Sequence, residues 1–218
     1  MELSPARREI LEAAAACFME QGFHATSLDV VARRMKATKG RVYHHYPSKM
    51  DLFFDVHRLG MDLLFQAVEP AGETPGDAME ILARMMKAHA LALFEHHAFE
   101  SVVVQGVHLH RFGATTPEQR RVLDQLIASR DRFEGLFRQQ LKRAQQQQLM
   151  APLDPSIAVK TLLGGLQWSL IWYRPEIDDS VANRERLADA MVRTLLDGLR
   201  AREGVAKAAA RGTARGKR

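Results

Sequence analysis

Cationic and aromatic side chains of the kinds that bind nucleic acid are concentrated between Lys39 and Lys49. Arg41 has the most specific chemistry, because a guanidinium can donate to O6 and N7 of one guanine at the same time. Gly40 has no side chain, which permits close approach of the backbone to DNA. The other side chains that could reach phosphates or base edges are Lys39, Tyr43, His44 and His45. This segment therefore predicts a DNA contact.

Simpler roles compete with DNA contact in this segment. Tyr43 could pack against the first helix, and Lys39 could be a solvated charge. His44 and His45 could be exposed residues without a role. A helical hairpin with no DNA partner is the corresponding alternative for the segment as a whole.

Two short amphipathic helices must position these side chains. Thr26 is expected to cap the first helix and Thr38 the second, after a turn of three residues. Their apolar faces are Leu28, Val31 and Met35 in the first, and Val42 and Tyr46 in the second. Two such helices form a helix-turn-helix, whose second helix can enter the major groove.

Residues 7–55 resemble the DNA-binding domain of the tetracycline-repressor (TetR) family. The resemblance is specific, because many separate positions agree in spacing. One departure is in the turn, where the family usually has a small residue and glycine and this chain has Met35 and Lys36. The matching positions are Ile10, Ala13, Ala14, Phe18, Gly22, Phe23, Thr26, Ser27, Val31, Ala32, Lys39, Gly40, Tyr43, Tyr46, Pro47, Ser48, Lys49 and Leu52.

The resemblance implies a role in DNA binding for individual residues. Thr26 and Ser27 stand at a helix N-terminus, where free N–H groups and the helix dipole favour a phosphate. Tyr43 and Lys49 match family positions that grip phosphates. Positions near base edges are matched by Lys39, Gly40, Arg41 and His44, and His45 matches a position that touches backbone or base in some members.

Helix starts are clear along the whole chain. Four times a capping residue is followed by proline, as in Ser4-Pro5 and Asp154-Pro155, and proline suits the first helical position. Apolar residues recur at helical spacing between these starts. We expect an all-α fold of about nine helices, at 5–21, 27–36, 39–45, 49–69, 76–96, 98–111, 117–148, 155–173 and 180–201.

Charge and composition divide the chain into three parts. The net charge is +3 over residues 1–50, −3 over 51–201 and +5 over 202–218, and basic ends favour a polyanionic partner. We expect a helix-turn-helix domain over 1–50 and a helical ligand-binding and dimerisation domain over 51–201. The segment 202–218 has no large apolar residue, so it is expected to be a basic disordered tail.

A cytoplasmic location is expected. Cys17 is the single cysteine, which excludes an intrachain disulfide and favours a reducing compartment. The longest uncharged apolar stretch, Thr161–Tyr173, is 13 residues long and too short to span a bilayer. The chain does not open with a basic segment followed by an apolar run, so no signal peptide is expected.

The resemblance implies that the C-terminal helices bind a small molecule and form a dimer. The expected eighth helix contains Thr161, Gly164, Gly165 and Trp168, and the ninth contains Met191, Leu195 and Gly198 at matching spacing. Glycine is unfavourable inside a helix, so paired glycines indicate helices that approach closely. A homodimer through the last two helices is predicted, and close packing within one subunit is the alternative.

Residues 166–175 also resemble regulators of fatty-acid, sterol or aromatic-acid breakdown, some of which sense acyl-coenzyme A thioesters. A hydrophobic pocket is expected among the middle helices, and core packing is the alternative for each candidate. The candidates are Met86, Leu93, Phe94, Phe99, Val103, Phe112, Phe133, Phe137, Trp168 and Trp172.

No cofactor, metal site or catalytic site is expected. Histidines 89, 96, 97, 108 and 110 include no His-x-x-x-His pair, and Glu95 and Glu100 do not complete a recognisable site. There is no Gly-x-Ser-x-Gly and no phosphate-binding glycine loop.

These observations together predict a ligand-responsive transcriptional repressor. It would bind a near-palindromic operator as a dimer and be released by a small hydrophobic effector, such as an acyl-CoA or an aromatic acid derivative. The alternatives from other classes are a helical enzyme that uses the histidines and a non-specific DNA-coating protein driven by the basic tail.

Overall fold

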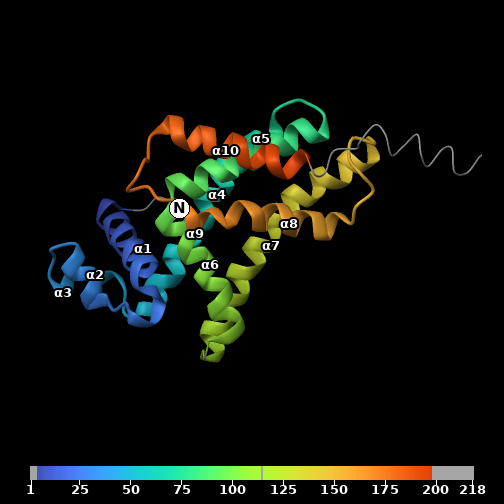
Figure 1. Cartoon of the computed structure of the whole chain (residues 1–218). Helices are drawn as coiled ribbons and strands as arrows, with labels where there is room; N and C mark the ends of the chain where they lie inside the picture. Colours follow the sequence, from blue (N-terminus) through green and yellow to red (C-terminus); the bar gives the residue numbers. More distant parts are fainter. Residues whose placement is uncertain (1–3, 114, 198–218) are drawn as a thin grey trace, which may run out of the picture. The chain divides into compact units, whose positions relative to one another are not determined.

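The computed structural model describes residues 4–113 and 115–197, and the elements within these ranges are all helices (Figure 1). The all-α prediction is therefore confirmed. The predicted tail 202–218 and Gly198 lie outside the described residues. The helices are α1 (Pro5–Ala25), α2 (Leu28–Arg34), α3 (Lys39–His45), α4 (Lys49–Glu73), α5 (Ala78–Glu95), α6 (His97–Phe112), α7 (Pro117–Gln146), α8 (Pro155–Gln167), α9 (Ser169–Trp172) and α10 (Val181–Asp197).

Most helix boundaries lie close to the predicted ones, and the differences have local causes. The expected helix 155–173 is divided after Gln167 into α8 and α9. Helix α1 extends past residue 21 across a kink at Gly22, whose φ of 76° is accessible to glycine. Helix α4 continues through Pro70 to Glu73, and the Thr74 hydroxyl donates to the Pro70 carbonyl at 3.1 Å.

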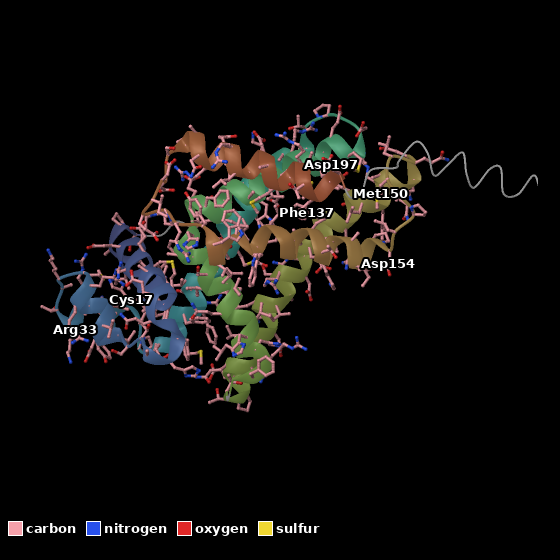
Figure 2. All side chains as sticks on the ribbon, viewed as in Figure 1. Cys17, Arg33, Phe137, Met150, Asp154 and Asp197 are labelled. Atoms are coloured by element: carbon pink, nitrogen blue, oxygen red, sulfur yellow. The ribbon has the colours of Figure 1, made fainter. Side chains whose placement is uncertain are left out.

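One compact unit comprises the described part of residues 1–67, 92–133 and 169–173. Its core joins α1, α2 and α3 to α4 and α6, and Figure 1 shows α2 and α3 beside α1. Phe18 and Phe53 are fully buried and make an edge-to-face contact at 5.3 Å between ring centroids. Gln105 of α6 donates from Nε2 to the Phe18 carbonyl at 2.9 Å. Helix α6 is therefore bonded directly to the first helix of the predicted DNA-binding domain. Cys17, labelled in Figure 2, is buried in the same core.

The second compact unit comprises residues 68–91, 134–168 and the described part of 174–218. Lys87 of α5 forms ion pairs with Glu185 and Asp189 of α10, at 2.7 and 2.8 Å. A Cβ on Gly165 of α8 would lie 2.8 Å from Leu195 of α10, so α8 and α10 approach closely at this glycine. The two neighbouring glycines thus differ in their surroundings: Gly165 faces α10, whereas a Cβ on Gly164 would meet nothing within 4 Å.

No helix of the described part is long and apolar enough to cross a membrane.

Candidate nucleic-acid interface

Helix α3 is attached to its unit by very few residues. Val42 is the one buried residue of α3, and Tyr46 directly after it is only 2% exposed. The N–H of Tyr46 donates to the Val42 carbonyl at 2.9 Å, which closes the last turn. With the apolar side directed inward, the remaining side chains of α3 face outward. Figure 2 shows side chains projecting from α2 and α3, with Arg33 labelled.

A partly buried polar network fixes the end of α3 to α1 and α4. The Tyr46 hydroxyl accepts a hydrogen bond from Nε of Arg7 at 2.9 Å and donates to Oδ2 of Asp55 at 3.2 Å. Arg7 also pairs with the same Asp55 oxygen, and Arg58 donates to Oδ1 at 2.7 Å. Burial raises the pKa of Tyr46, and the hydrogen bond to Tyr46 is the main cause of a raised pKa at Arg7. This network sets the position from which α3 projects.

The residues predicted to contact bases and phosphates from α3 lie on its outer side. Lys39, Gly40, Arg41 and His44 are exposed, and Tyr43 is 50% exposed. His45 is half-buried, and its ring meets the ring of His44 edge-to-face at 5.1 Å between centroids. The exposed group therefore has the accessibility that DNA contact requires.

Both cations of the first turn of α3 are paired with carboxylates of their own chain. Lys39 pairs with Asp29 of α2. Nη2 of Arg41 lies 2.5 Å from Oε2 of Glu9 on α1. Sequence reasoning missed Glu9, because 32 residues separate it from Arg41 and no local pattern connects them.

The start of α2 differs from the prediction by one residue. Ser27 is the N-cap, and its hydroxyl accepts from the Val30 N–H at 3.2 Å. Thr26 is 1% exposed, and its hydroxyl is shared between the carbonyl oxygens of Cys17 and Gly22, at 3.1 and 2.9 Å. The Thr26 side chain thus connects α1 to α2, whereas Ser27 is exposed. The phosphate contacts predicted for these two residues stay predictions.

Lys49 connects the start of α4 to the end of α1. Its ammonium donates to the carbonyl oxygens of Phe23 and His24 at 2.7 and 3.1 Å, and lies 4.5 Å from the centre of the Phe23 ring. Burial lowers the pKa of Lys49. The interaction with a phosphate implied by the family resemblance stays a prediction, since the ammonium has carbonyl partners here.

The turn between α2 and α3 is a Schellman motif with lysine at the left-handed position. Lys36 has a φ of 52°. Its N–H donates to the Arg33 carbonyl at 3.0 Å, and the N–H of Ala37 donates to the Ala32 carbonyl at 3.0 Å. Glycine adopts this conformation without strain, whereas lysine has a Cβ that crowds the backbone. The departure noted at Met35-Lys36 is thus accommodated by a lysine in the conformation typical of glycine.

The ten ligand candidates are distributed over both units and differ in exposure. Six are buried: Met86, Leu93, Phe94, Val103, Phe133 and Phe137. Phe112 and Trp168 are 71% and 64% exposed. Phe112 lines a cleft of about 190 Å³ with Phe23, His24, Gln105, His108, Leu109 and Gly113. Contact of any of the ten with a ligand stays a prediction.

Two buried ionisable residues on α4 and α6 are the strongest polar features that sequence reasoning did not assign to a pocket. Glu100 is fully buried, and neither of its carboxylate oxygens has a hydrogen-bond partner within the described residues. Burial raises its pKa well above the usual value. The His57 ring packs against Gly106, where a Cβ would clash with the ring, and burial together with Arg130 lowers the pKa of His57 to about 4. A polar residue inside an apolar helical stretch is the signal that could have identified them.

The predicted absence of a metal site concerns five histidines, of which four lie on α5 and α6 and His96 lies between these helices. Nε2 of His97 lies 3.1 Å from the Leu170 carbonyl oxygen, and Nε2 of His110 lies 2.8 Å from Oδ1 of Asp124. Over residues 4–113 and 115–197, no group of three histidine, cysteine or acidic residues is arranged to hold a metal ion.

Comparison with known proteins yields two family matches. Residues 10–56 match the family described as bacterial regulatory proteins, tetR family, and residues 75–199 match the family described as tetracyclin repressor-like, C-terminal domain. The transcriptional repressor KstR2 of Mycobacterium tuberculosis is 26% identical over 174 residues, which cover 80% of this chain and 84% of KstR2.

Two solved structures resemble the chain over most of its length. The TetR family regulator PfmR of Thermus thermophilus is 33% identical with a TM-score of 0.72, over 86% of this chain and 97% of PfmR. AibR, solved in complex with isovaleryl coenzyme A and operator DNA, is 29% identical with a TM-score of 0.68, over 86% of this chain and 96% of AibR.

Proposed function

The chain belongs to the TetR family of bacterial regulatory proteins, and we propose that it is a repressor released from its operator by a small hydrophobic effector. The family makes it a transcription regulator rather than an enzyme. The observation that carries the proposal is the exposure of Lys39, Arg41 and Tyr43 on the outward side of α3, while Val42 anchors the opposite side of this helix. A regulator of this kind works in the bacterial cytoplasm.

DNA recognition in this proposal belongs to residues 1–50. Helix α3 enters the major groove, where Arg41 donates to a guanine and Gly40 permits close approach. Tyr43 and Ser27 are exposed and are the proposed phosphate contacts. Thr26 and Lys49 support the interface from within, because the Thr26 hydroxyl and the Lys49 ammonium donate to carbonyl groups of α1.

Dimerisation in this proposal uses the exposed face of α8 and the neighbouring α10, within residues 51–201. Ile157 and Trp168 are 62% and 64% exposed, and Gly164 between them offers open space to a second helix. Exposed apolar side chains on one face favour burial against a second copy. A two-fold dimer presents two α3 helices to half-sites roughly 34–36 Å apart on one side of a near-palindromic operator.

The proposed effector is an acyl-CoA thioester or an aromatic acid derivative. Support comes from the relatives, since AibR was solved with isovaleryl coenzyme A and KstR2 is described as a ketosteroid regulator. Among the apolar candidates, Phe94 and Trp172 lie edge-to-face with 6.4 Å between ring centroids. An effector and an operator that favour different conformations weaken each other's binding reciprocally.

Selection of bound duplexes from a random pool tests the DNA proposal. The full-length protein should enrich a near-palindrome and bind it about 10³-fold or more tightly than random duplex at the same salt concentration. A chain ending at residue 201 should keep this preference and lose mainly salt-sensitive background affinity. Equal affinity of the full chain for every duplex would support the non-specific coating protein instead.

The selected duplex then provides the test of the effector. Isovaleryl coenzyme A, longer acyl thioesters and aromatic acids are screened for a rise in the thermal unfolding midpoint, because a ligand that binds the folded state stabilises it. A true effector should also release the duplex at the concentrations that raise the midpoint. Stabilisation without release would identify a ligand that does not regulate DNA binding.

A further inference from the structure

Arg41 has an anionic partner before any DNA is present. Its guanidinium donates to the Glu9 carboxylate at 2.5 Å, and the two side chains are 42% and 50% exposed. Glu9 stands on α1, the helix that packs behind the helix-turn-helix. The predicted base-reading group is thus held at the protein surface by a residue that itself faces solvent.

We propose that Glu9 is a specificity-determining residue. Its ion pair with Arg41 disfavours contacts of Arg41 with phosphates, which occur in DNA of any sequence, whereas a guanine at the matching position can displace Glu9. This inference rests on the proposed function, because it requires that Arg41 reads DNA. Glu9 acts through Arg41 and through repulsion of DNA, and it makes no bond to a base.

The competition between anions explains the effect. A phosphate offers Arg41 a charge-assisted hydrogen bond of the same kind that Glu9 already supplies, so exchange to a phosphate gains little. The Glu9 carboxylate also repels any phosphate that approaches Arg41. A guanine at the matching position offers O6 and N7 together inside the groove, whereas Glu9 is bonded to Arg41 here by the single contact between Oε2 and Nη2.

Breaking the ion pair between Arg41 and Glu9 costs little free energy, so Arg41 can exchange Glu9 for a guanine. Exposed ion pairs contribute little to stability, and the Glu9 carboxylate can be hydrated once Arg41 has left. The pair of Lys39 and Asp29 differs, because Oδ1 of Asp29 is buried without a hydrogen-bond partner in the described part of the chain. A change at Asp29 would disturb α2, whereas Glu9 can be changed without touching the core.

Glu12 supplies the matched control. It lies three residues further along α1, is exposed, and forms no ion pair within the described residues. Glu9→Gln and Glu12→Gln therefore remove the same charge from the same helix, but only the first frees Arg41.

The experiment measures the affinity of the full-length wild type and both variants for the selected operator and for random duplex over a range of salt concentrations. Glu9→Gln should bind random duplex several-fold more tightly and steepen its salt dependence by about 0.9 logarithmic units per subunit, because Arg41 then neutralises one more phosphate. Operator affinity should rise less, so the specificity ratio falls. Glu12→Gln should raise both affinities alike and keep the wild-type ratio.

Three results would overturn the proposal. Equal specificity ratios for Glu9→Gln and Glu12→Gln would reduce Glu9 to one more surface charge. A ratio that falls because operator affinity is lost would make Glu9 a support for α3. A wild type without any duplex preference would remove the proposed function as well, whereas the first two results leave that function intact.

Discussion

Helix α3 exposes Lys39, Arg41 and Tyr43, whereas α8 exposes Ile157, Thr161 and Gly164, with Trp168 directly after it. The first face is cationic and the second is apolar with an open space at its centre. Charged side chains are well hydrated and can stay exposed to water when no partner is bound, but exposed tryptophan and isoleucine favour permanent burial. This difference underlies the proposal that α3 binds a polyanionic partner transiently and that α8 binds a second copy of the chain permanently.

The two faces also differ in what they contact within the chain. Both cations at the start of α3 have carboxylate partners, Glu9 and Asp29, which DNA must displace. Ile157 of α8 and Trp168 directly after it are exposed and uncharged, so a partner that covers them has no ion pair to displace at these two residues. A substitution on α8 should therefore act on assembly, and one near α3 on the choice of DNA sequence.

The largest effect is expected from a charge on the apolar face. Gly164→Arg should raise the dimer dissociation constant by at least about 100-fold, because each copy would bury an unpaired guanidinium. Operator binding should fall with it, since one subunit reads one half-site. Sedimentation equilibrium and operator affinity measure the two consequences.

Gly135→Arg is the control for this prediction, because a Cβ on Gly135 of α7 also meets nothing within 4 Å. It should leave the dimer intact. A Gly164→Arg protein that stays dimeric would remove α8 from the interface and with it the contrast between the two faces.

The next largest effect concerns the interior between α4 and α6, where His57 of α4 packs against Gly106 of α6. Its pKa is about 4 in the folded protein against an ordinary 6.5, so the unfolded chain takes up this proton first as the pH falls. Stability should therefore be lost between about pH 6.5 and 4, by up to about 3 kcal/mol from His57 alone.

Urea unfolding of the wild type and His57→Leu at about pH 7 and about pH 4.5 measures this loss. The variant should lose less stability on acidification, and the exposed-residue variant His108→Gln should behave like the wild type. Parallel losses in the wild type and His57→Leu would contradict the burial of an uncharged His57.

The smallest effect is expected at the turn before α3. Lys36→Gly should be more stable than Lys36→Ala by about 1 kcal/mol, because glycine adopts the φ of 52° without a crowded Cβ. Both variants remove the charge, so their difference isolates the backbone. Equal unfolding free energies would show that the left-handed turn carries no strain, and the two variants should have the same base preference.

The contrast between α3 and α8 also explains which features the sequence could predict. The bounds predicted for α3 agree with the structure at both ends, and Thr38 is at the N-cap position, although its side chain does not make the expected capping hydrogen bond. The close approach at Gly165 also followed from the helical positions of small residues, although its partner is Leu195 within the same chain.

Features that depend on distant partners were not predictable. Glu9 meets Arg41 across 32 residues, and nothing near either position indicates the pair. A polar residue inside an apolar stretch marks Glu100 and His57 as unusual, but the burial itself depends on how α4 and α6 pack, which a local pattern does not show. The Thr26 hydroxyl was assigned to the solvent side of a cap, but the kink at Gly22 directs α1 carbonyl groups toward it.

The base preference of Arg41→Ala, compared with the wild type by selection from the same random pool, tests the central claim most directly. The account predicts that preference for guanine disappears at one position of each half-site and that operator affinity falls by about 1–3 kcal/mol. An unchanged operator affinity and an unchanged preference at every position would contradict the assignment of α3 as the reading helix through Arg41.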